Sequence, residues 1–291
     1  MDAAAALPLS AALDRLLARC PARRRSGQRG AYSFREAGEE TETETGETLV
    51  LLHGIGSGSA SWAHQLTQLA GRRRVVAWDA PGYGESDPLR EASPSAADYA
   101  AALGDFLDML GLARVALIGH SLGALMAAAF ARAQPERIAG LILASPAGGY
   151  ARAGAAERER RLAERLDALA TLGPAGLARS RARHLLGPSA APAALALVEW
   201  SMARLRPEGY AQAARMLAAG DIAADLAAWL RPVLVVSGSA DSVTSEANCR
   251  AVAAAAPHGV YTGISGAGHA LYADMPERFN AVVAAHLDEA P

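Results

Sequence analysis

The stretch from Arg114 to Pro135, RVALIGHSLGALMAAAFARAQP, decides the fold of this chain. It opens with Val115 to Ile118, a short β-branched and aliphatic run that is typical of a buried strand. The turn GHSLG follows at residues 119 to 123, and Ala124 to Ala133 is a run of strong helix formers. The order strand, tight turn, helix predicts that the hydroxyl of Ser121 stands above a sheet edge, at the positive end of a helix.

A membrane span is the alternative interpretation of the same stretch, because no charged residue falls between Arg114 and Arg132. Its length is at the low edge of the ~20 residues that a bilayer requires. Glycine, histidine and serine also interrupt it near the middle. A membrane span is therefore not expected.

Composition excludes several classes of protein. The net charge of −2 gives no electrostatic case for nucleic-acid binding. All 28 basic residues are arginine, which excludes lysine Schiff-base chemistry and the phosphate-loop lysine. Cys20 and Cys249 are isolated and lack metal-ligand spacing, so neither a metal site nor a disulfide framework is expected. With no basic segment ahead of the first apolar residues, a secretory signal is not expected, and a cytoplasmic location fits.

Strands and helices alternate along most of the chain. Ala31 to Ala37 is expected to be an edge strand, and buried strands are expected at Leu49 to Leu52, Val75 to Trp78, Ile138 to Ala144, Pro232 to Ser237 and Gly259 to Ile264. Helical patterns separate these runs. The alternation predicts an α/β fold, with a mostly parallel sheet covered on both faces and binding groups at the carboxyl ends of the strands.

Residues 149–224 interrupt this alternation. They show no strand pattern, only Ala, Leu and Arg helices broken at glycine-proline pairs. We therefore expect a helical cap inserted into one core, which comprises residues 31–148 and 225–291. Residues 1–30 are expected to form a short amphipathic helix followed by a solvated basic linker at Arg23 to Arg25.

Two further polar residues belong with Ser121. A serine is a poor nucleophile until a base takes its proton and a third group holds that base. Asp241 comes directly after the strand at 232–237, and His269 comes directly after the strand at 259–264. Because the carboxyl ends of parallel strands meet at one edge, all three side chains are expected at the same edge, in the chain order Ser, Asp, His.

With these motifs the chain resembles the α/β-hydrolase fold family of enzymes with a helical cap. The matching motifs are HGIG at 53–56, DAPGYGES at 79–86, GHSLG at 119–123, GSADSVT at 238–244 and GAGHALYADMPERFN at 266–280. The resemblance implies Ser121 as nucleophile, His269 as general base and Asp241 as the acid that orients the base. It also implies that the main-chain N–H groups of Ile55 and Leu122 form the oxyanion hole.

Candidate substrate contacts are Gly54 in the HG loop, His120 beside the nucleophile, and Trp200 in the cap. His120 either lines the pocket wall or points away from the substrate. An apolar wall is expected from cap residues that include Leu185, Leu186, Leu197, Trp200, Met202 and Met216.

Some residues have a structural interpretation that is favoured over a functional one. In the family the loop aspartate at Asp79 is usually architectural, although it is the rival for the triad acid, and His53 is expected to be structural. Arg179, Arg181 and Arg183 are expected to form a solvated helix face; the alternative is that they hold an anionic substrate.

The function that the resemblance implies is hydrolysis of a carboxylic ester or lactone of a small, fairly apolar substrate, through an acyl-enzyme and without a cofactor. The alternative is a carbon-carbon hydrolase that acts on a ring-cleavage product. Such enzymes typically carry Asn before the nucleophile and Trp after the histidine, whereas this chain has His120 and Ala270.

Two other classes of function stay open. A hydrolase-fold protein can bind a ligand with little turnover, because fold does not fix function. A dinucleotide site at Gly54-Ile55-Gly56 is not favoured, since Ser59 stands where the third glycine belongs. Beyond a small-molecule substrate, the one partner left open is a second copy of the chain, as a homo-oligomer.

Overall fold

An eight-stranded sheet forms the centre of the protein, in the order β1-β2-β4-β3-β5-β6-β7-β8. The computed structural model describes residues 11–38 and 47–289. The strands are β1 Arg23–Ser26, β2 Ala31–Ala37, β3 Leu49–Leu52, β4 Val75–Trp78, β5 Val115–His120, β6 Ile138–Ala144, β7 Val233–Gly238 and β8 Gly259–Ile264. β2 runs antiparallel to β1 and to β4, and the other neighbouring strands are parallel. The predicted mostly parallel sheet is confirmed.

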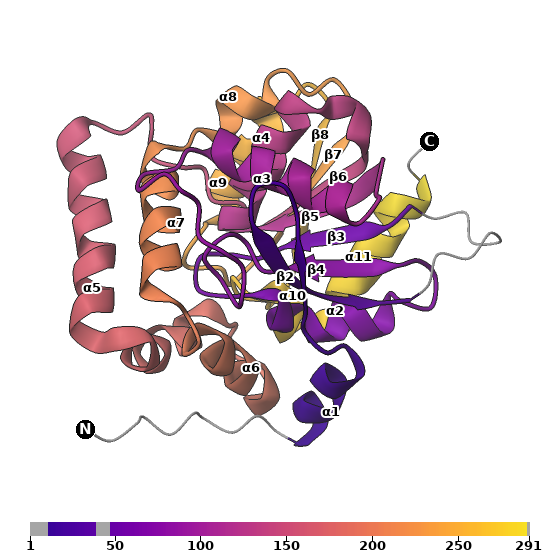
Figure 1. Ribbon diagram of the computed structural model, residues 1–291, viewed down its shortest axis with the longest axis horizontal. Helices are drawn as coiled ribbons and strands as arrows, with labels where there is room; N and C mark the ends of the chain where they lie inside the picture. The colour runs from indigo at the N-terminus through magenta and orange to yellow at the C-terminus, as the bar shows by residue number, and fades with distance from the viewer. Residues whose placement is uncertain (1–10, 39–46, 290–291) are drawn as a thin grey trace.

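Helices cover both faces of this sheet (Figure 1). One face carries α3 Ala96–Met109, α4 Leu122–Ala133, α8 Ile222–Leu226 and α9 Glu246–Ala255, and the other carries α1 Ala11–Arg19, α2 Ala63–Gln68, α10 Leu271–Asp274 and α11 Pro276–Glu289. Short 3-10 helices are η1 Ser59–Trp62, η2 Pro135–Arg137 and η3 Ala182–Leu185. In β3, Leu49 and Leu51 pack into one core while Val50 and Leu52 pack into the other. A strand buried on both faces therefore needs a continuous apolar run.

Two expectations for the N-terminal side are wrong. Arg23–Ser26, expected to be part of a linker, forms the edge strand β1. As a result Ala31–Ala37 is a strand but not an edge strand, because β1 and β4 flank it. All four β1 residues are exposed, so the strand is held by main-chain pairing and by ion pairs such as Arg24 Nη2 to Asp87 Oδ1 at 2.9 Å. The expected first helix is α1, and residues 1–10 lie outside the described residues.

A strained turn between β5 and α4 places Ser121. This residue has φ 51° and ψ −111°, a combination that residues other than glycine rarely adopt. The flanking glycines permit the turn: a Cβ on Gly119 would lie 2.5 Å from the Gly123 carbonyl oxygen, and one on Gly123 would lie 2.3 Å from the Leu52 carbonyl oxygen. Larger residues at 119 and 123 would therefore push the helix away from the sheet.

The helical insert lies between β6 and β7 and consists of α5 Ala155–Arg181, α6 Pro192–Met202 and α7 Pro207–Ala219. In Figure 1, α5 is the outermost element and α7 lies between it and the sheet. The backbone of α5 is not helical at Gly173, where φ is 62° and Pro174 follows. The expected boundary at residue 224 falls inside α8, which packs on α4 and α9. The division of the chain into cap and core stays a prediction.

The long apolar stretch that opened the sequence analysis is divided between two elements. β5 and α4 are both buried, and α4 is 12 residues long. None of the helices in the described ranges combines the length and the apolarity needed to cross a membrane.

Candidate active site

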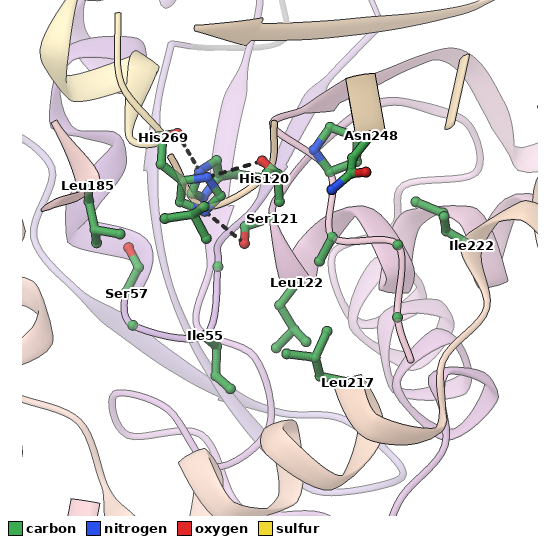
Figure 2. Close-up of a pocket in the computed structure, with 18 of the residues that line it drawn as sticks. Ile55, Ser57, His120, Ser121, Leu122, Leu185, Leu217, Ile222, Asn248 and His269 are labelled. Carbon is green, nitrogen blue, oxygen red and sulfur yellow. Dashed lines mark hydrogen bonds between the residues drawn. The ribbon is translucent and has the colours of Figure 1, made fainter. Parts of the chain in front are cut away.

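Three side chains from separate strand ends meet at the carboxyl edge of the sheet. Ser121 follows β5, Asp241 follows β7 and His269 follows β8. Ser121 Oγ lies 3.0 Å from His269 Nε2 (Figure 2), and His269 Nδ1 lies 2.9 Å from Asp241 Oδ2. With this geometry the imidazole can accept the serine proton at Nε2 while its Nδ1–H donates to the carboxylate.

The carboxylate of Asp241 is well supplied with hydrogen-bond donors. Its Oδ1 accepts from the main-chain N–H groups of Val243 at 2.8 Å and Thr244 at 2.9 Å, and its Oδ2 also accepts from Thr244 Oγ1 at 2.8 Å. Burial raises the pKa of Asp241, but the hydrogen bonds from His269 and Thr244 outweigh burial and hold the pKa well below its usual value. Asp241 is therefore ionised at neutral pH and can stabilise a protonated His269.

The loop after β3 faces the serine and is held rigidly. A Cβ on Gly54 would lie 3.2 Å from Ser121 Cβ. His53 Nδ1 donates to the Gly54 carbonyl oxygen at 2.8 Å, and Tyr83 Oη donates to the Ile55 carbonyl oxygen at 3.0 Å. Because the C=O and N–H of one trans peptide point in opposite directions, fixing the Gly54 carbonyl also fixes the Ile55 N–H.

His53 has the structural role expected of it. Its Nε2 accepts from the Ala80 main-chain N–H at 3.0 Å, so each ring nitrogen has one partner. Burial lowers the pKa of His53 and keeps the ring neutral, as one donor and one acceptor require. The ring thus links the loop after β3 to the loop after β4.

His120 lines the cavity wall beside the nucleophile. Its Nε2 donates to the main-chain oxygen of His269 at 3.0 Å, and its ring centroid lies 4.8 Å from that of Tyr272. Burial, and then the charge of His269, lower the pKa of His120 to about 3. The ring is therefore neutral near pH 7, and its N–H supports the backbone of His269.

Lowering the pH is expected to destabilise the protein through His120. The unfolded chain protonates this histidine near ~6.5, whereas the folded protein does so at about 3. Between these values the unfolded state binds more protons, so the free energy of unfolding falls as the pH falls. Between pH 7 and pH 4, the free energy of unfolding should decrease by roughly 3 kcal/mol less in His120→Gln than in the wild-type protein. Urea unfolding at the two pH values measures this difference.

The wild-type protein and His120→Gln share the other ionisable groups that surround position 120. His269, Asp241 and His53 all influence the His120 ring. They remain in His120→Gln, and a glutamine amide can still donate to the His269 carbonyl. An identical pH dependence in wild type and His120→Gln would contradict the low pKa of His120.

Two residues weighed from the sequence do not join the site. Asp79 accepts from the Ser59 N–H at 2.7 Å and from the hydroxyls of Ser59 and Ser33, so it ties together the loops after β3 and β4. Trp200 does not line the cavity, and the guanidinium of Arg204 stacks 3.8 Å from its ring centroid. The expectation that Trp200 contacts the substrate is corrected accordingly: Val198 and Met202 of α6 face the cavity, two positions away on either side, so Trp200 points elsewhere.

Ser121 opens onto a cavity of about 920 Å³ between the sheet edge and the helical insert. Figure 2 shows Leu185 and Leu217 among the labelled residues around the serine and histidine. The apolar lining residues include Ile55, Leu122, Leu177, Leu185, Val198, Met202 and Leu217. Of the wall residues expected from the sequence, Leu185 and Met202 line the cavity, whereas Leu186, Leu197 and Met216 are buried in the cores. Gly54 also lines it.

The sequence analysis did not identify most of the polar residues of the insert that line the cavity. Tyr150, Arg152, Arg161 and Arg165 line the cavity together with Arg181. Arg179 is exposed, and Arg183 donates to the main-chain oxygens of Gly187 and Pro188. In the sequence all these arginines look alike, because each occupies an Arg-rich helical or loop segment.

Within the ranges that the structure describes, no group of three or more His, Cys, Asp or Glu side chains is placed to hold a metal ion. Cys20 and Cys249 are buried free thiols.

The fold is similar to that of known proteins. Residues 47–276 match the family model described as alpha/beta hydrolase fold. The structure is similar to that of a thermophilic esterase from Thermogutta terrifontis, with a TM-score of 0.81 and 25% identity over 93% of this chain and 99% of that one. It is also similar to the enol-lactonase from Burkholderia xenovorans LB400, with a TM-score of 0.79 and 23% identity over 92% of this chain and 100% of that one.

A curated relative shares a shorter segment. The 2-hydroxy-6-oxononadienedioate/2-hydroxy-6-oxononatrienedioate hydrolase 2 of Pseudomonas putida is 45% identical over 104 residues. This match spans 34% of the present chain and 36% of the relative.

Proposed function

The chain belongs to the α/β-hydrolase fold family, and from this premise we propose that it is a serine hydrolase that cleaves a carboxylic ester or lactone of a small, fairly apolar substrate. The observation that carries the proposal is the series of hydrogen bonds from Ser121 through His269 to Asp241, at 3.0 and 2.9 Å. The helical insert, residues 149–224, acts in this proposal as the cap that shapes the substrate cavity.

The proposed reaction proceeds through an acyl-enzyme. Ser121 Oγ attacks the carbonyl carbon while His269 Nε2 takes the serine proton, and Asp241 stabilises the imidazolium. The oxyanion that forms is held by the main-chain N–H groups of Ile55 and Leu122. Collapse of this intermediate expels the alkoxide, which takes the proton from His269; with a lactone the alcohol stays on the acyl group.

Hydrolysis of the acyl-enzyme repeats these steps with water. His269 takes a proton from the water as its oxygen attacks the acyl carbon, and then returns that proton to Ser121 Oγ. The product is a carboxylic acid, and the enzyme is restored without a cofactor.

Ester or lactone cleavage is favoured over carbon-carbon cleavage for two reasons. The reaction requires only the triad and two main-chain donors, whereas carbon-carbon cleavage also requires groups that ketonise a dienol. The positions beside Ser121 and His269 carry His120 and Ala270 in place of the Asn and Trp typical of those enzymes. The esterase and the enol-lactonase of similar structure support this choice, and the Pseudomonas putida relative supports the carbon-carbon alternative.

A small substrate panel tests the bond type. We expect kcat/KM for p-nitrophenyl butyrate or a simple lactone to exceed that for a ring-fission dienoate by at least about tenfold. The measurement is steady-state hydrolysis of all three compounds under one condition, with Ser121→Ala as the background control. Efficient dienoate cleavage with negligible esterase activity would place the enzyme in the carbon-carbon class. Binding of the panel without any turnover would favour the ligand-binding alternative.

A further inference from the structure

Positive charge gathers in the candidate active-site cavity, although the whole chain has a formal net charge of −2. Four arginines and one carboxylate line the cavity: Arg152, Arg161, Arg165, Arg181 and Asp221. The carboxylate is already paired, because Arg152 Nε lies 2.8 Å from Asp221 Oδ2. Of the other three, Arg161 is paired with Glu157. Within the described residues Arg165 and Arg181 have no carboxylate as ion-pair partner, so this side of the cavity attracts anions.

Arg165 of α5 has phenols rather than carboxylates beside its guanidinium. Its side chain is half-buried, and its Nη2 donates to Tyr150 Oη at 3.3 Å. The second neighbour of its guanidinium is another phenol, that of Tyr210. In the described part of the chain, no carboxylate lies within ion-pair distance of Arg165. Phenols do not replace a carboxylate as counter-charge near pH 7.

The pKa of Tyr150 indicates that the charge around its phenol is positive. Burial raises the pKa of Tyr150, but the charges of Arg165 and Arg161 outweigh burial, and the pKa falls below its usual value. Arg161 also lies over the Tyr150 ring, with its Cζ 4.8 Å from the centroid. Two guanidinium groups therefore converge on one phenol that belongs to the loop after β6.

Neighbouring arginines on the same helix are paired. Arg160 pairs with Glu157 and Glu164, and Arg161 Nε lies 2.6 Å from Glu157 Oε1. Such exposed ion pairs contribute little to stability. They compensate the charge of Arg160 and Arg161 on the surface of α5. Arg165 lies one turn beyond Arg161 and also lines the cavity, but within the described residues it has no glutamate or aspartate partner. A partly buried cation without a counter-charge destabilises a fold, and a bound anion removes that penalty.

We propose that Arg165 and Tyr150 form a specificity-determining subsite that binds an anionic group of the substrate, carboxylate or phosphate, at a distance from the ester that Ser121 attacks. This inference rests on the proposed hydrolase function and narrows its substrate class. The apolar residues near Ser121, such as Leu122 and Leu217, contact the acyl chain, and the anionic end of the chain reaches α5. A guanidinium presents a planar fork of donors that suits both carboxylate and phosphate, and the Tyr150 O–H adds one more donor.

Esters that differ in the group at the end of the acyl chain distinguish an effect on anion binding from an effect on the reaction at Ser121. The probes are p-nitrophenyl hexanoate, p-nitrophenyl hydrogen adipate and p-nitrophenyl 5-phosphonopentanoate, which share a leaving group and nearly share chain length. With Arg165→Gln we expect kcat/KM to fall by roughly 10- to 100-fold for an anionic ester, mainly through KM. For the hexanoate it should stay within about threefold. The anionic ester with the larger loss identifies carboxylate or phosphate as the preferred group.

Two control variants make the comparison decisive. Arg160→Gln removes an exposed arginine of the same helix that does not line the cavity, and should leave all three rates unchanged. Arg165→Lys keeps the charge and should restore part of the preference for the anionic ester. Equal losses of hexanoate and adipate hydrolysis in Arg165→Gln would show that Arg165 only joins α5 to the core, and would overturn the inference.

A binding measurement separates failure of this inference from failure of the proposed function. Ser121→Ala is titrated with adipate by calorimetry, beside the double variant Ser121→Ala/Arg165→Gln. Adipate should bind the single variant and lose at least about tenfold in affinity in the double variant. If no ester is hydrolysed but adipate binds through Arg165, the anion subsite stands and the hydrolase proposal fails. Ester hydrolysis with no Arg165-dependent preference or binding would leave the hydrolase and remove the subsite.

Discussion

Ser121→Ala is expected to lower kcat for ester hydrolysis by about four to six orders of magnitude. Without Oγ no acyl-enzyme forms, and only the rate due to substrate binding and the oxyanion hole remains. Steady-state kinetics measures this loss, and intact mass after treatment with a fluorophosphonate measures the nucleophile directly. The wild-type protein should gain one adduct, and Ser121→Ala should gain none.

Ser145 provides a matched control for that experiment. It is also a buried serine with positive φ, 43°, directly after a central strand. Within the described residues its Oγ has no hydrogen-bond partner, so no base activates it. Ser145→Ala should therefore keep both the adduct and most of the activity. An adduct that persists in Ser121→Ala would disprove the assignment of the nucleophile.

The position of Ser121 could be predicted because its signals are local. An apolar strand, two glycines and a run of helix formers follow one another in β5, the turn and α4. The meeting of Ser121 with Asp241 and His269 is long-range, yet it was also predictable. Parallel strands place their carboxyl ends at one edge, so residues that directly follow β5, β7 and β8 have few other places to lie.

Strand β1 could not be predicted, since its side chains carry no strand signal. Arg23 to Ser26 are all exposed and show no alternation of apolar and polar residues. The pairing with β2 depends on main-chain groups, which every sequence possesses. Arginines in such a run are typical of a solvated segment as much as of an edge strand.

The charged wall of the cavity was missed for a similar reason. Arg160 and Arg165 each follow a glutamate in the same Arg-rich segment, but Arg160 is paired with glutamates and Arg165 faces Tyr150. Only the packing of α5 beside the loop after β6 distinguishes them. Periodicity gives the face of a helix, and tertiary contacts decide which part of that face borders a cavity.

Asp241→Asn is expected to lower kcat by about 10⁴-fold while the protein remains folded. The asparagine can still accept from the N–H groups of Val243 and Thr244 through its Oδ1, which preserves the loop. Its amide N–H₂ would face His269 Nδ1 and favour the tautomer with the proton on Nε2. In that tautomer Nε2 donates to Ser121 and cannot accept its proton.

Asp79→Asn is the matched control, because Asp79 is the other buried loop aspartate after a strand. Its carboxylate accepts from Ser33 and Ser59, so losing one acceptor should cost about 1–3 kcal/mol of stability. The rate per folded molecule should fall by less than about tenfold. Urea unfolding and active-site titration with a fluorophosphonate separate these two effects. If Asp79→Asn instead lost more activity per folded molecule than Asp241→Asn, Asp241 would not be the acid that orients His269.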